Sequence, residues 1–514
     1  MAAAVLAHVS GNRMSDGRVS RWPRFWYPVR MEKTVNIIGG GLAGSEAALQ
    51  LASRNISVNL IEMRPATPTP VHTGGSLAEL VCSNSLKTMK GDKPAGMLKH
   101  ELALLGSHLL DCALKSRVAA GGALAVDRHR FSEAVDTLVA QAPRINRIPG
   151  EAIGLSGTTV LYRTPMGEEL VSTADALIIA TGPLTSDAFA ETVQTLTGSD
   201  GMAFYDAAAP IVMADSLDMG VLFRQSRYGD SDAGDYLNAP FSKPEYERFI
   251  DALLEAKRVI ARDFETKDLF CACQPIEEIA RRGFDAPRHG MMKPVGLTDP
   301  RTGRRPYAAV QLRAEDAHAS SYNLVGFQTN LTFPEQQRVF RLIPGLENAE
   351  FARYGVMHRN TFIDAPNLLD SAFRLRTQDA PVYFAGQVSG TEGYCEAIMS
   401  GLYVALNVYG ALTATPVPPL PDTTSFGSLI AYATDPSVRD YQPMHVNFGV
   451  FPPLEQPIRN KGQRYRAFLE RQVSAMDDYV TELVKAGIID QPATGLVDRL
   501  ETAIAEAGLS GSSD

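Results

Sequence analysis

Cysteine is scarce in this 514-residue sequence. The five cysteines form an odd set without a C-x-x-C pair: Cys82, Cys112, Cys271, Cys273 and Cys395. A secreted disulfide framework needs a dense, even set of cysteines, and a zinc ribbon needs paired C-x-x-C motifs. Neither is indicated, and a reducing cytoplasm is the simplest location for the protein.

Long apolar runs and an excess of positive charge are also missing. No uninterrupted apolar stretch approaches the roughly 20 residues that span a bilayer, so we expect no membrane association. The net charge is −9, which argues against a polybasic nucleic-acid coat but leaves room for a local basic patch. The composition is otherwise that of an ordinary globular protein, and the length allows two or three domains.

A secretory signal is absent from the N-terminus as well. Residues 1–30 contain Arg, Ser and a single acid, but no long apolar core. We expect residues 1–33 to be a leader outside the folded domains, either disordered or not native, with Met31 as the functional start. A weak resemblance to an organelle transit peptide is the alternative.

The stretch Val35–Glu62 organises what is present. Four mostly apolar residues, Val35–Ile38, predict a buried strand, and glycines with the spacing G-x-G-x-x-G follow it directly. A helical stretch and a second strand come next, and Glu62 ends that strand about twenty residues after the turn. This order is typical of a dinucleotide-binding unit. A glycine-rich turn without a ligand is the alternative.

Each part of this motif has a mechanical task. Gly39 permits the tight turn, Gly41 lets a pyrophosphate approach the backbone, and Gly44 lets the helix pack closely on the strand. Unpaired N–H groups at the helix start attract the phosphate charge, and Glu62 would accept hydrogen bonds from a ribose. We therefore predict that the cofactor is bound by Gly39, Gly40, Gly41, Leu42, Ala43, Gly44 and Glu62.

Two later glycine turns favour a long dinucleotide. The apolar strand at 176–179 ends in Ala-Thr-Gly, a turn that resembles the one under the adenine half of the cofactor in glutathione-reductase-type flavoproteins. Near residue 386 another strand leads through glycines into a long helix, whose N-terminus can stabilise an anionic reduced flavin. We therefore predict FAD rather than a mobile NAD in an α/β, Rossmann-type FAD-binding fold, contacted also by Gly182, Gly386 and Gly393.

The sequence between these turns has a different character. From about Phe204 to Tyr354, charged and aromatic residues are dense and the glycine motif does not recur. We predict a discontinuous FAD-binding domain (residues 34–205 and 355–412), an inserted mixed α/β domain (206–354) and a C-terminal extension with helices (413–514). Within the insertion, residues 281–306 carry seven Arg and Lys against two Asp. This is a candidate phosphate-facing surface, with a solvated loop as the alternative.

Blocks spread along the chain resemble one family. They include GGGLAGSEAALQLA, ELVCSNSL, GGALAVDRHRFS, CQPIEEIARRG, MKPVGLTDPRTGRRPYAAVQLR, MHRNTF and FAGQVSGTEGY. From about Thr34 to Phe451 they look like the bacterial FAD- and folate-dependent tRNA (uracil-5-)-methyltransferases. The resemblance implies methylation of the T-loop uridine at tRNA position 54, with methylenetetrahydrofolate as carbon donor and NAD(P)H as reductant. It implies no obligatory protein partner.

The reaction of that family calls for an activated cysteine and a flavin. Uracil C5 becomes nucleophilic enough to attack a one-carbon donor when a thiolate adds to C6. A methylene must gain two electrons to become a methyl, so a folate donor demands a reductant. By resemblance, Cys273 in CQPIE is the nucleophile, and Cys82 in CSNS is a flavin-proximal thiol acting as base or transient adduct. The reverse assignment stays open, and either residue could be a small buried hydrophobe.

The resemblance also implies binding residues. His358 in MHRNTF and Tyr394 in TEGY match blocks near the flavin, where an imidazole or a phenol could cover a pterin stacked on the ring. A structural histidine is the alternative for His358. For tRNA we predict contacts from Arg281, Arg282, Lys293, Arg304 and Arg305, with the target uridine flipped out of its loop. We predict no metal ligands.

Two other functions fit parts of the sequence. One is the related flavoprotein class that modifies the wobble uridine of tRNA together with a GTPase, resembling the glucose-inhibited division protein A family. The CQPIE and MHRNTF blocks argue against it. The other is a flavin-bound RNA-binding protein without transfer chemistry, which leaves the two cysteines without a purpose. The choice between NADH and NADPH stays open, because no second nucleotide motif is visible.

Overall fold

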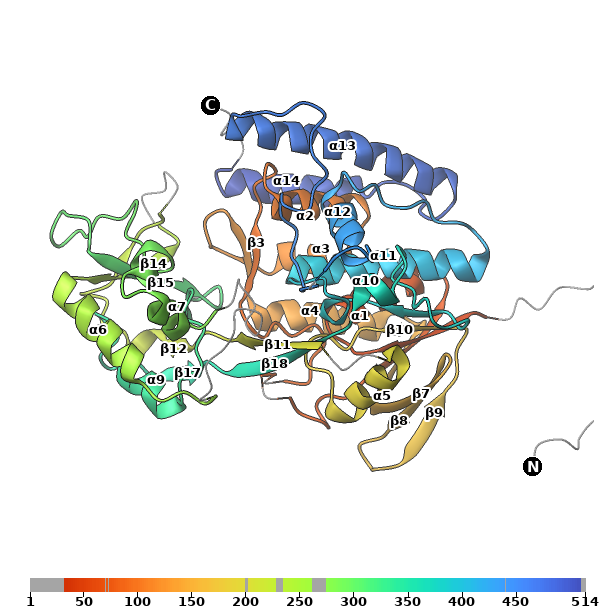
Figure 1. The fold of residues 1–514 in the computed structure, drawn as a ribbon, viewed down its shortest axis with the longest axis horizontal. Coiled ribbons are helices and arrows are strands. Elements are labelled where there is room, and N and C mark those ends of the chain that lie inside the picture. The colour runs from red at the N-terminus through yellow and green to blue at the C-terminus, as the bar shows by residue number, and fades with distance from the viewer. Residues whose placement is uncertain are drawn as a thin grey trace, which may run out of the picture. The chain divides into compact units, whose positions relative to one another are not determined.

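A parallel five-stranded sheet carries the first glycine motif in the computed structural model (Figure 1). The strand order is β19-β10-β1-β2-β6, with every pair parallel. The strands are β1 (Thr34–Ile38), β2 (Ser57–Glu62), β6 (Ile145–Pro149), β10 (Ala176–Ile179) and β19 (Val382–Phe384). Because β1 and β10 are buried along nearly their whole length, they read in the sequence as continuous apolar runs.

The structure describes residues 32–69, 71–72, 74–198, 202–227, 234–260, 274–439 and 441–509. Residues 33–514 form one compact unit, separate from residues 1–32. Nearly all of the predicted leader lies outside the described residues. The same holds for Cys271 and for the predicted nucleophile Cys273.

Two apolar helices far apart in the sequence pack against each other beside the parallel sheet. They are α1 (Leu42–Ser53), which follows β1, and α11 (Tyr394–Thr413), which follows β19. A Cβ added at Gly401 would lie 2.2 Å from the Ala43 carbonyl oxygen, so a glycine permits the close approach. Among the described residues, α11 is the one helix long and apolar enough to cross a bilayer, but 78% of its apolar window is buried inside the protein. It is therefore explained as a core helix.

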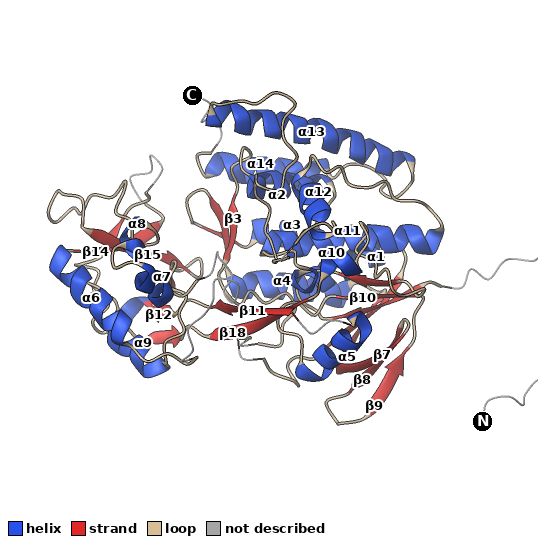
Figure 2. Ribbon diagram, in the orientation of Figure 1, coloured by secondary structure: helices blue, strands red, loops and turns tan. Residues whose placement is uncertain are grey.

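Further helices and two small antiparallel sheets complete this part of the fold (Figure 2). The helices are α2 (Pro94–Leu104), α3 (His108–Lys115), α4 (Arg128–Gln141), α5 (Asp187–Thr197) and α10 (Ala365–Leu368), with the short 3-10 turn η4 (Gln387–Ser389). One small sheet has the order β3-β5-β4, with β3 (Ser85–Thr88), β4 (Arg117–Val118) and β5 (Ala123–Val126). The other has β7 (Glu151–Ser156), β8 (Thr159–Arg163) and β9 (Glu169–Ser172).

A six-stranded antiparallel sheet with its own apolar core lies in the insertion. Its order is β13-β14-β15-β16-β12-β17, made by β12 (Ile211–Met213), β13 (Phe223–Arg224), β14 (Tyr236–Phe241), β15 (Ala308–Ala314), β16 (Ser321–Leu324) and β17 (Phe351–Arg353). The helical segments there are η1 (Ala214–Ser216), α6 (Lys243–Glu255), α7 (Ile276–Arg282), α8 (Ala286–His289) and α9 (Phe333–Phe340). The antiparallel pair β11 (Met202–Ala207) and β18 (Met357–Phe362) carries the chain out to this sheet and back.

The C-terminal segment adds three helices, α12 (Ser425–Ala433), α13 (Lys461–Lys485) and α14 (Thr494–Glu506). Apolar side chains of α13 and α14, such as Tyr479 and Leu500, belong to the same buried core as the strands of the parallel sheet. The extension is therefore packed onto the predicted FAD-binding part. The division into three domains remains our proposal.

Candidate dinucleotide and thiol site

The turn between β1 and α1 separates the tasks of its three motif glycines. Gly39 has a φ of +100°, and a Cβ there would lie 2.5 Å from the Ala180 carbonyl oxygen. A Cβ at Gly44 would lie 1.9 Å from the Gly39 carbonyl oxygen. A Cβ at Gly41 would meet nothing within 4 Å. Gly39 and Gly44 therefore shape the turn, and Gly41 leaves open space where a pyrophosphate can approach the backbone.

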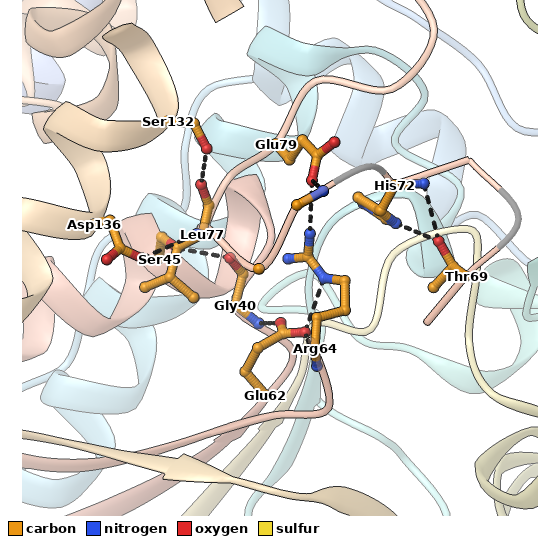
Figure 3. Close-up of polar contacts among 12 residues, drawn as sticks. Gly40, Ser45, Glu62, Arg64, Thr69, His72, Leu77, Glu79, Ser132 and Asp136 are labelled. Carbon is orange, nitrogen blue, oxygen red and sulfur yellow. Dashed lines mark hydrogen bonds and ion pairs between the residues drawn. The ribbon is translucent and has the colours of Figure 1, made fainter. Parts of the chain in front are cut away.

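The Glu62 carboxylate is fixed beneath this turn (Figure 3). One oxygen accepts the Gly40 N–H at 2.6 Å, and the other accepts the backbone N–H and the Nε of Arg64, each at 2.9 Å. Burial alone would raise the pKa of this carboxyl, but the charge and hydrogen bonds of Arg64 hold it below the usual value. Glu62 is thus ionised and oriented, and the oxygen that accepts the Gly40 N–H has a further lone pair with which to accept a ribose hydroxyl.

A cavity with about 940 Å³ of empty space opens beside the turn. Its lining includes these predicted cofactor residues: Gly39, Gly41, Leu42, Ala43, Glu62, Gly182 and Gly386, together with Tyr394. Gly40, Gly44 and Gly393 do not line it. The Gly40 N–H is turned to Glu62, Gly44 packs against Gly39, and Gly393 is the N-cap of α11. Because the lining includes residues of both the early and the late glycine turns, the cavity suits a long dinucleotide such as FAD.

Several lining residues were not foreseen from the sequence. Arg64, His72, Glu79, Thr181, Thr185 and Gln387 also line the cavity. Arg64 bridges Glu62 and Glu79, with its Nη1 3.4 Å from a Glu79 oxygen, and so ties the loop after β2 to the cavity wall (Figure 3). Arg64 had one local signal, its place two residues after the motif acid, and Thr181 lies in the Ala-Thr-Gly turn that the sequence indicated. His72, Glu79, Thr185 and Gln387 come from loops and turns whose course is set by tertiary packing.

The loop that carries Cys82 contacts the first residue of α11. The Tyr394 hydroxyl oxygen accepts the backbone N–H groups of Cys82 and Ser83, at 2.9 and 3.1 Å. The half-buried Cys82 has its Sγ 3.8 Å from the Ala207 carbonyl oxygen. Burial raises the pKa of the Tyr394 phenol far above its usual range, so the hydroxyl stays neutral. Since Tyr394 also lines the cavity, this contact places the thiol loop at its wall.

Three arginines from separate elements hold the same loop. Arg128 at the start of α4 donates to the Leu80 carbonyl at 2.6 Å and pairs with Glu315. Arg313 on β15 donates to Asn84 Oδ1 and Ser83 Oγ, each at 2.7 Å. Arg353 on β17 donates to the Val81 carbonyl oxygen. Two of the three come from the insertion, so its sheet directly fixes the loop around Cys82.

Of the residues predicted to bind folate and uracil, some lie outside the described part of the chain. Cys273 does, and Gln274, the next residue, is described and lies just before α7. The backbone of His358 lies in β18, opposite Asp206 of β11. Tyr394 lies at the cavity wall with its hydroxyl held by the thiol loop. Within the described segments, no group of three or more His, Cys, Asp or Glu is arranged to hold a metal.

The predicted basic residues lie in three places within the insertion. Arg281 and Arg282 are at the end of α7, where they donate to the Leu254 carbonyl and to Gln274 Oε1, at 3.0 and 2.8 Å. Arg304 and Arg305 are exposed and line a hollow of about 1090 Å³. Neither of their side chains has a hydrogen-bond or ion-pair partner in the described part of the chain. Lys293 is half-buried in the loop after α8.

Sequence comparison identifies the family. The profile of the family described as glucose inhibited division protein A matches residues 34–416. The methylenetetrahydrofolate--tRNA-(uracil-5-)-methyltransferase TrmFO of Geobacter sulfurreducens is 50% identical over 454 residues, covering 88% of this chain and 99% of the relative. The TrmFO of Pelotomaculum thermopropionicum is 48% identical over 452 residues, with the same shares covered. This chain belongs to the TrmFO family.

Solved structures agree with this family at the level of the fold. Aquifex aeolicus GidA, in its form I crystal, superposes with a TM-score of 0.66 at 16% identity, covering 92% of this chain and 79% of that one. The form II crystal gives a TM-score of 0.65. The predicted fold class and the predicted family are therefore confirmed. TrmFO relatives and this chain share almost their whole lengths, whereas the likeness to the Aquifex aeolicus GidA structures, at 16% identity, is one of fold.

Proposed function

We propose that this protein methylates C5 of a uridine in tRNA, taking the carbon from methylenetetrahydrofolate and the electrons from NAD(P)H. The uridine is that of the T-loop, position 54. One observation carries the proposal. The dinucleotide cavity built by Gly39–Gly44 has Tyr394 in its wall, and the Tyr394 hydroxyl binds the backbone of Cys82. A redox cofactor and a thiol therefore meet at one place, which this chemistry requires.

FAD is the cofactor that fits this cavity. The open space at Gly41 would hold the pyrophosphate, the carboxylate of Glu62 would hold the ribose, and Gly182 and Gly386 would contact the rest of the cofactor. The positive end of α11 would stabilise negative charge on a reduced flavin. Bound and reduced, FAD supplies the two electrons that turn a methylene into a methyl group.

The two cysteines divide the work on uracil. The Cys273 thiolate adds to C6, so an S–C6 bond forms and the electron pair moves to make C5 an enolate-like nucleophile. C5 then bonds to the methylene carbon as the first of that carbon's two bonds to folate nitrogens breaks. Cys82, held at the cavity wall, takes the C5 proton as the second carbon–nitrogen bond breaks, which leaves an exocyclic methylene on C5. Two electrons and a proton then reach the methylene carbon, the C5–C6 double bond returns, and the S–C6 bond breaks to release the Cys273 thiolate.

For the folate, His358 or Tyr394 would supply the ring that packs on the pterin when it is bound. The tRNA lies along the insertion, with its phosphates near Arg281, Arg282, Lys293, Arg304 and Arg305. The guanidinium groups of Arg304 and Arg305 support this placement, since they are exposed, have no side-chain partner among the described residues, and are available to a polyanion.

The decisive experiment supplies methylenetetrahydrofolate labelled on its one-carbon unit to the purified protein and unmodified tRNA. We expect labelled 5-methyluridine at position 54, found by mass spectrometry of the tRNA nucleosides, and only when NAD(P)H is present. Label in the wobble uridine, appearing only with an added GTPase, would support the alternative tRNA modification. Tight tRNA binding without any labelled product would support a non-catalytic RNA-binding protein.

A further inference from the structure

A cluster of cations surrounds one tyrosine near the start of α13, away from the basic stretch of the insertion. Lys93 Nζ lies 4.5 Å from the centre of the Tyr465 ring, Lys461 Nζ lies 5.5 Å from it, and Arg464 Cζ lies 5.9 Å from it. The ring packs on Phe448, with 4.3 Å between the two centroids. One cation over the ring is enough for a favourable cation–π contact, so packing alone does not explain why three gather there.

The positive charge of this cluster is poorly compensated. Lys93 has an ion pair with Asp92, with 2.6 Å between nitrogen and oxygen. Within the described residues, no carboxylate lies within ion-pair distance of Lys461 or Arg464, and Arg464 has only the Ile458 carbonyl at 3.4 Å. Residues 459–471 contain Arg459, Lys461, Arg464, Arg466 and Arg471 against the single acid Glu470. This local excess stands on a chain whose net charge is −9.

The charges also stand at the wrong end of the helix for stability. α13 begins at Lys461, and its first turn contains no acid. A cation in the first turn faces the positive end of the helix dipole, which is unfavourable for helix stability. Side chains that violate a local stability rule are typical of surfaces that serve a ligand. The ligand that offsets this cost is an anion.

The cluster continues the segment that carries Cys82. Lys90 and Lys93 lie in one turn, with 3.1 Å between the Lys90 carbonyl oxygen and the Lys93 N–H. Eleven residues separate Cys82 from Lys93, so their Cα atoms are at most about 40 Å apart. A macromolecular substrate whose target base sits at Cys82 can therefore reach the Tyr465 cluster with another part of its body.

We infer that Lys93, Lys461, Arg464 and Tyr465 form a second tRNA-binding surface, which holds the phosphodiester backbone outside the loop being modified. The inference rests on the proposed tRNA substrate. The cations contact phosphates, and the half-buried Tyr465, packed on Phe448, is the ring over which they gather. An RNA fits better than an acidic protein, because the proposed substrate is itself an RNA whose closely spaced phosphates match several cations held together.

The test compares two exposed lysines of one helix. Lys461→Gln removes a charge from the cluster, and Lys485→Gln removes one from the last turn of α13. The double variant Lys461→Gln/Arg464→Gln removes two. We expect the double variant to bind unmodified tRNA about tenfold more weakly at physiological salt. The slope of log affinity against log salt should fall by about one for each cation removed, while Lys485→Gln behaves as wild type.

A shortened substrate locates the contact. With an isolated T-arm hairpin, the double variant should match wild type, because the hairpin lacks the body that reaches the cluster. Equal tRNA affinity and equal salt slope in wild type and the double variant would overturn the inference. If the wild type bound tRNA but formed no 5-methyluridine, the proposed function would fail while the binding comparison still decided this surface. Unchanged thermal unfolding excludes a folding defect as the cause.

Discussion

Three glycines in the turn after β1 meet three different surroundings, and these decide what a methyl group added at each would do. Gly39 and Gly44 are enclosed by backbone atoms, and Gly41 faces open space. A spacing motif treats the three as equivalent members of one pattern. The distinction between a glycine that shapes the protein and a glycine that admits the ligand needs the surrounding atoms.

Gly41→Ala and Gly44→Ala should therefore fail in different ways. The Gly41 backbone has a φ of −73°, which alanine adopts freely, so the variant should fold normally and bind FAD at least about tenfold more weakly. Gly44→Ala drives its Cβ onto the Gly39 carbonyl and should cost about 3 kcal/mol of folding free energy. Flavin absorbance per protein and urea unfolding of the apoprotein separate the two effects. Equal FAD content in Gly41→Ala and wild type would contradict the assignment of Gly41.

Cys273→Ala should retain FAD and lose methyl transfer by about three orders of magnitude, because uracil C5 is not activated without the C6 adduct. The measurement is methyl transfer to tRNA that lacks the T-loop mark, at matched flavin content. Cys112→Ala is the control, since Cys112 is buried on α3 and its pKa is raised to about 12, mainly by burial. Full activity in Cys273→Ala would move the nucleophile to Cys82.

At the scale of elements, buried carboxylates link helices that are distant in the sequence. Glu101 on α2 accepts the backbone N–H groups of Ser425 and Phe426 at the start of α12, at 2.5 and 3.0 Å. These N–H groups have no partner within their own helix, so Glu101 satisfies them. Glu277 on α7 likewise accepts the Asn330 N–H and the Thr329 hydroxyl. Such contacts join elements whose partners no local pattern indicates.

The Glu101 contact should make stability depend on pH. Burial raises the pKa of Glu101 to about 8, so the folded state holds a proton that the unfolded state loses near pH 4.5. The stabilisation from this raised pKa is fully present below the unfolded pKa of 4.5. As the pH rises from there towards 8, the unfolded state releases the proton while the folded state keeps it, so the free energy of unfolding falls. Urea unfolding should therefore show a loss of about 3 to 5 kcal/mol between pH 4.5 and 8 from this group. A Glu101→Gln variant with the same pH profile as wild type would contradict this origin.

For the molecule as a whole, the insertion and the FAD-binding part meet at the Cys82 loop. Arg313 is 6% exposed and joins the β15 strand to Ser83 and Asn84. Its guanidinium is shared between one sheet and a loop that belongs to the other core. The position of the thiol therefore depends on how the insertion is seated.

Arg313→Met should keep the apolar stem and remove this link. We expect FAD content to stay at the wild-type level and kcat for methyl transfer to fall about 100-fold, because a displaced thiol no longer meets the reacting base. Arg224→Met is the control, since Arg224 lies in the same sheet and contacts Tyr322 instead. Wild-type kcat in Arg313→Met would show that the loop holds its position without the insertion.

The sequence by itself determined the dinucleotide unit, the cofactor class and the family, because strand period, glycine spacing and the acid at Glu62 are local properties of consecutive residues. It also indicated Cys82 and Tyr394 through short blocks. Only the tertiary structure decided that Tyr394 holds the Cys82 backbone and that Arg128, Arg313 and Arg353 converge there. It alone also placed Lys93 beside Tyr465, 372 residues later in the sequence. These contacts join residues from distant elements, and the packing of two cores, which no spacing encodes, sets their distances.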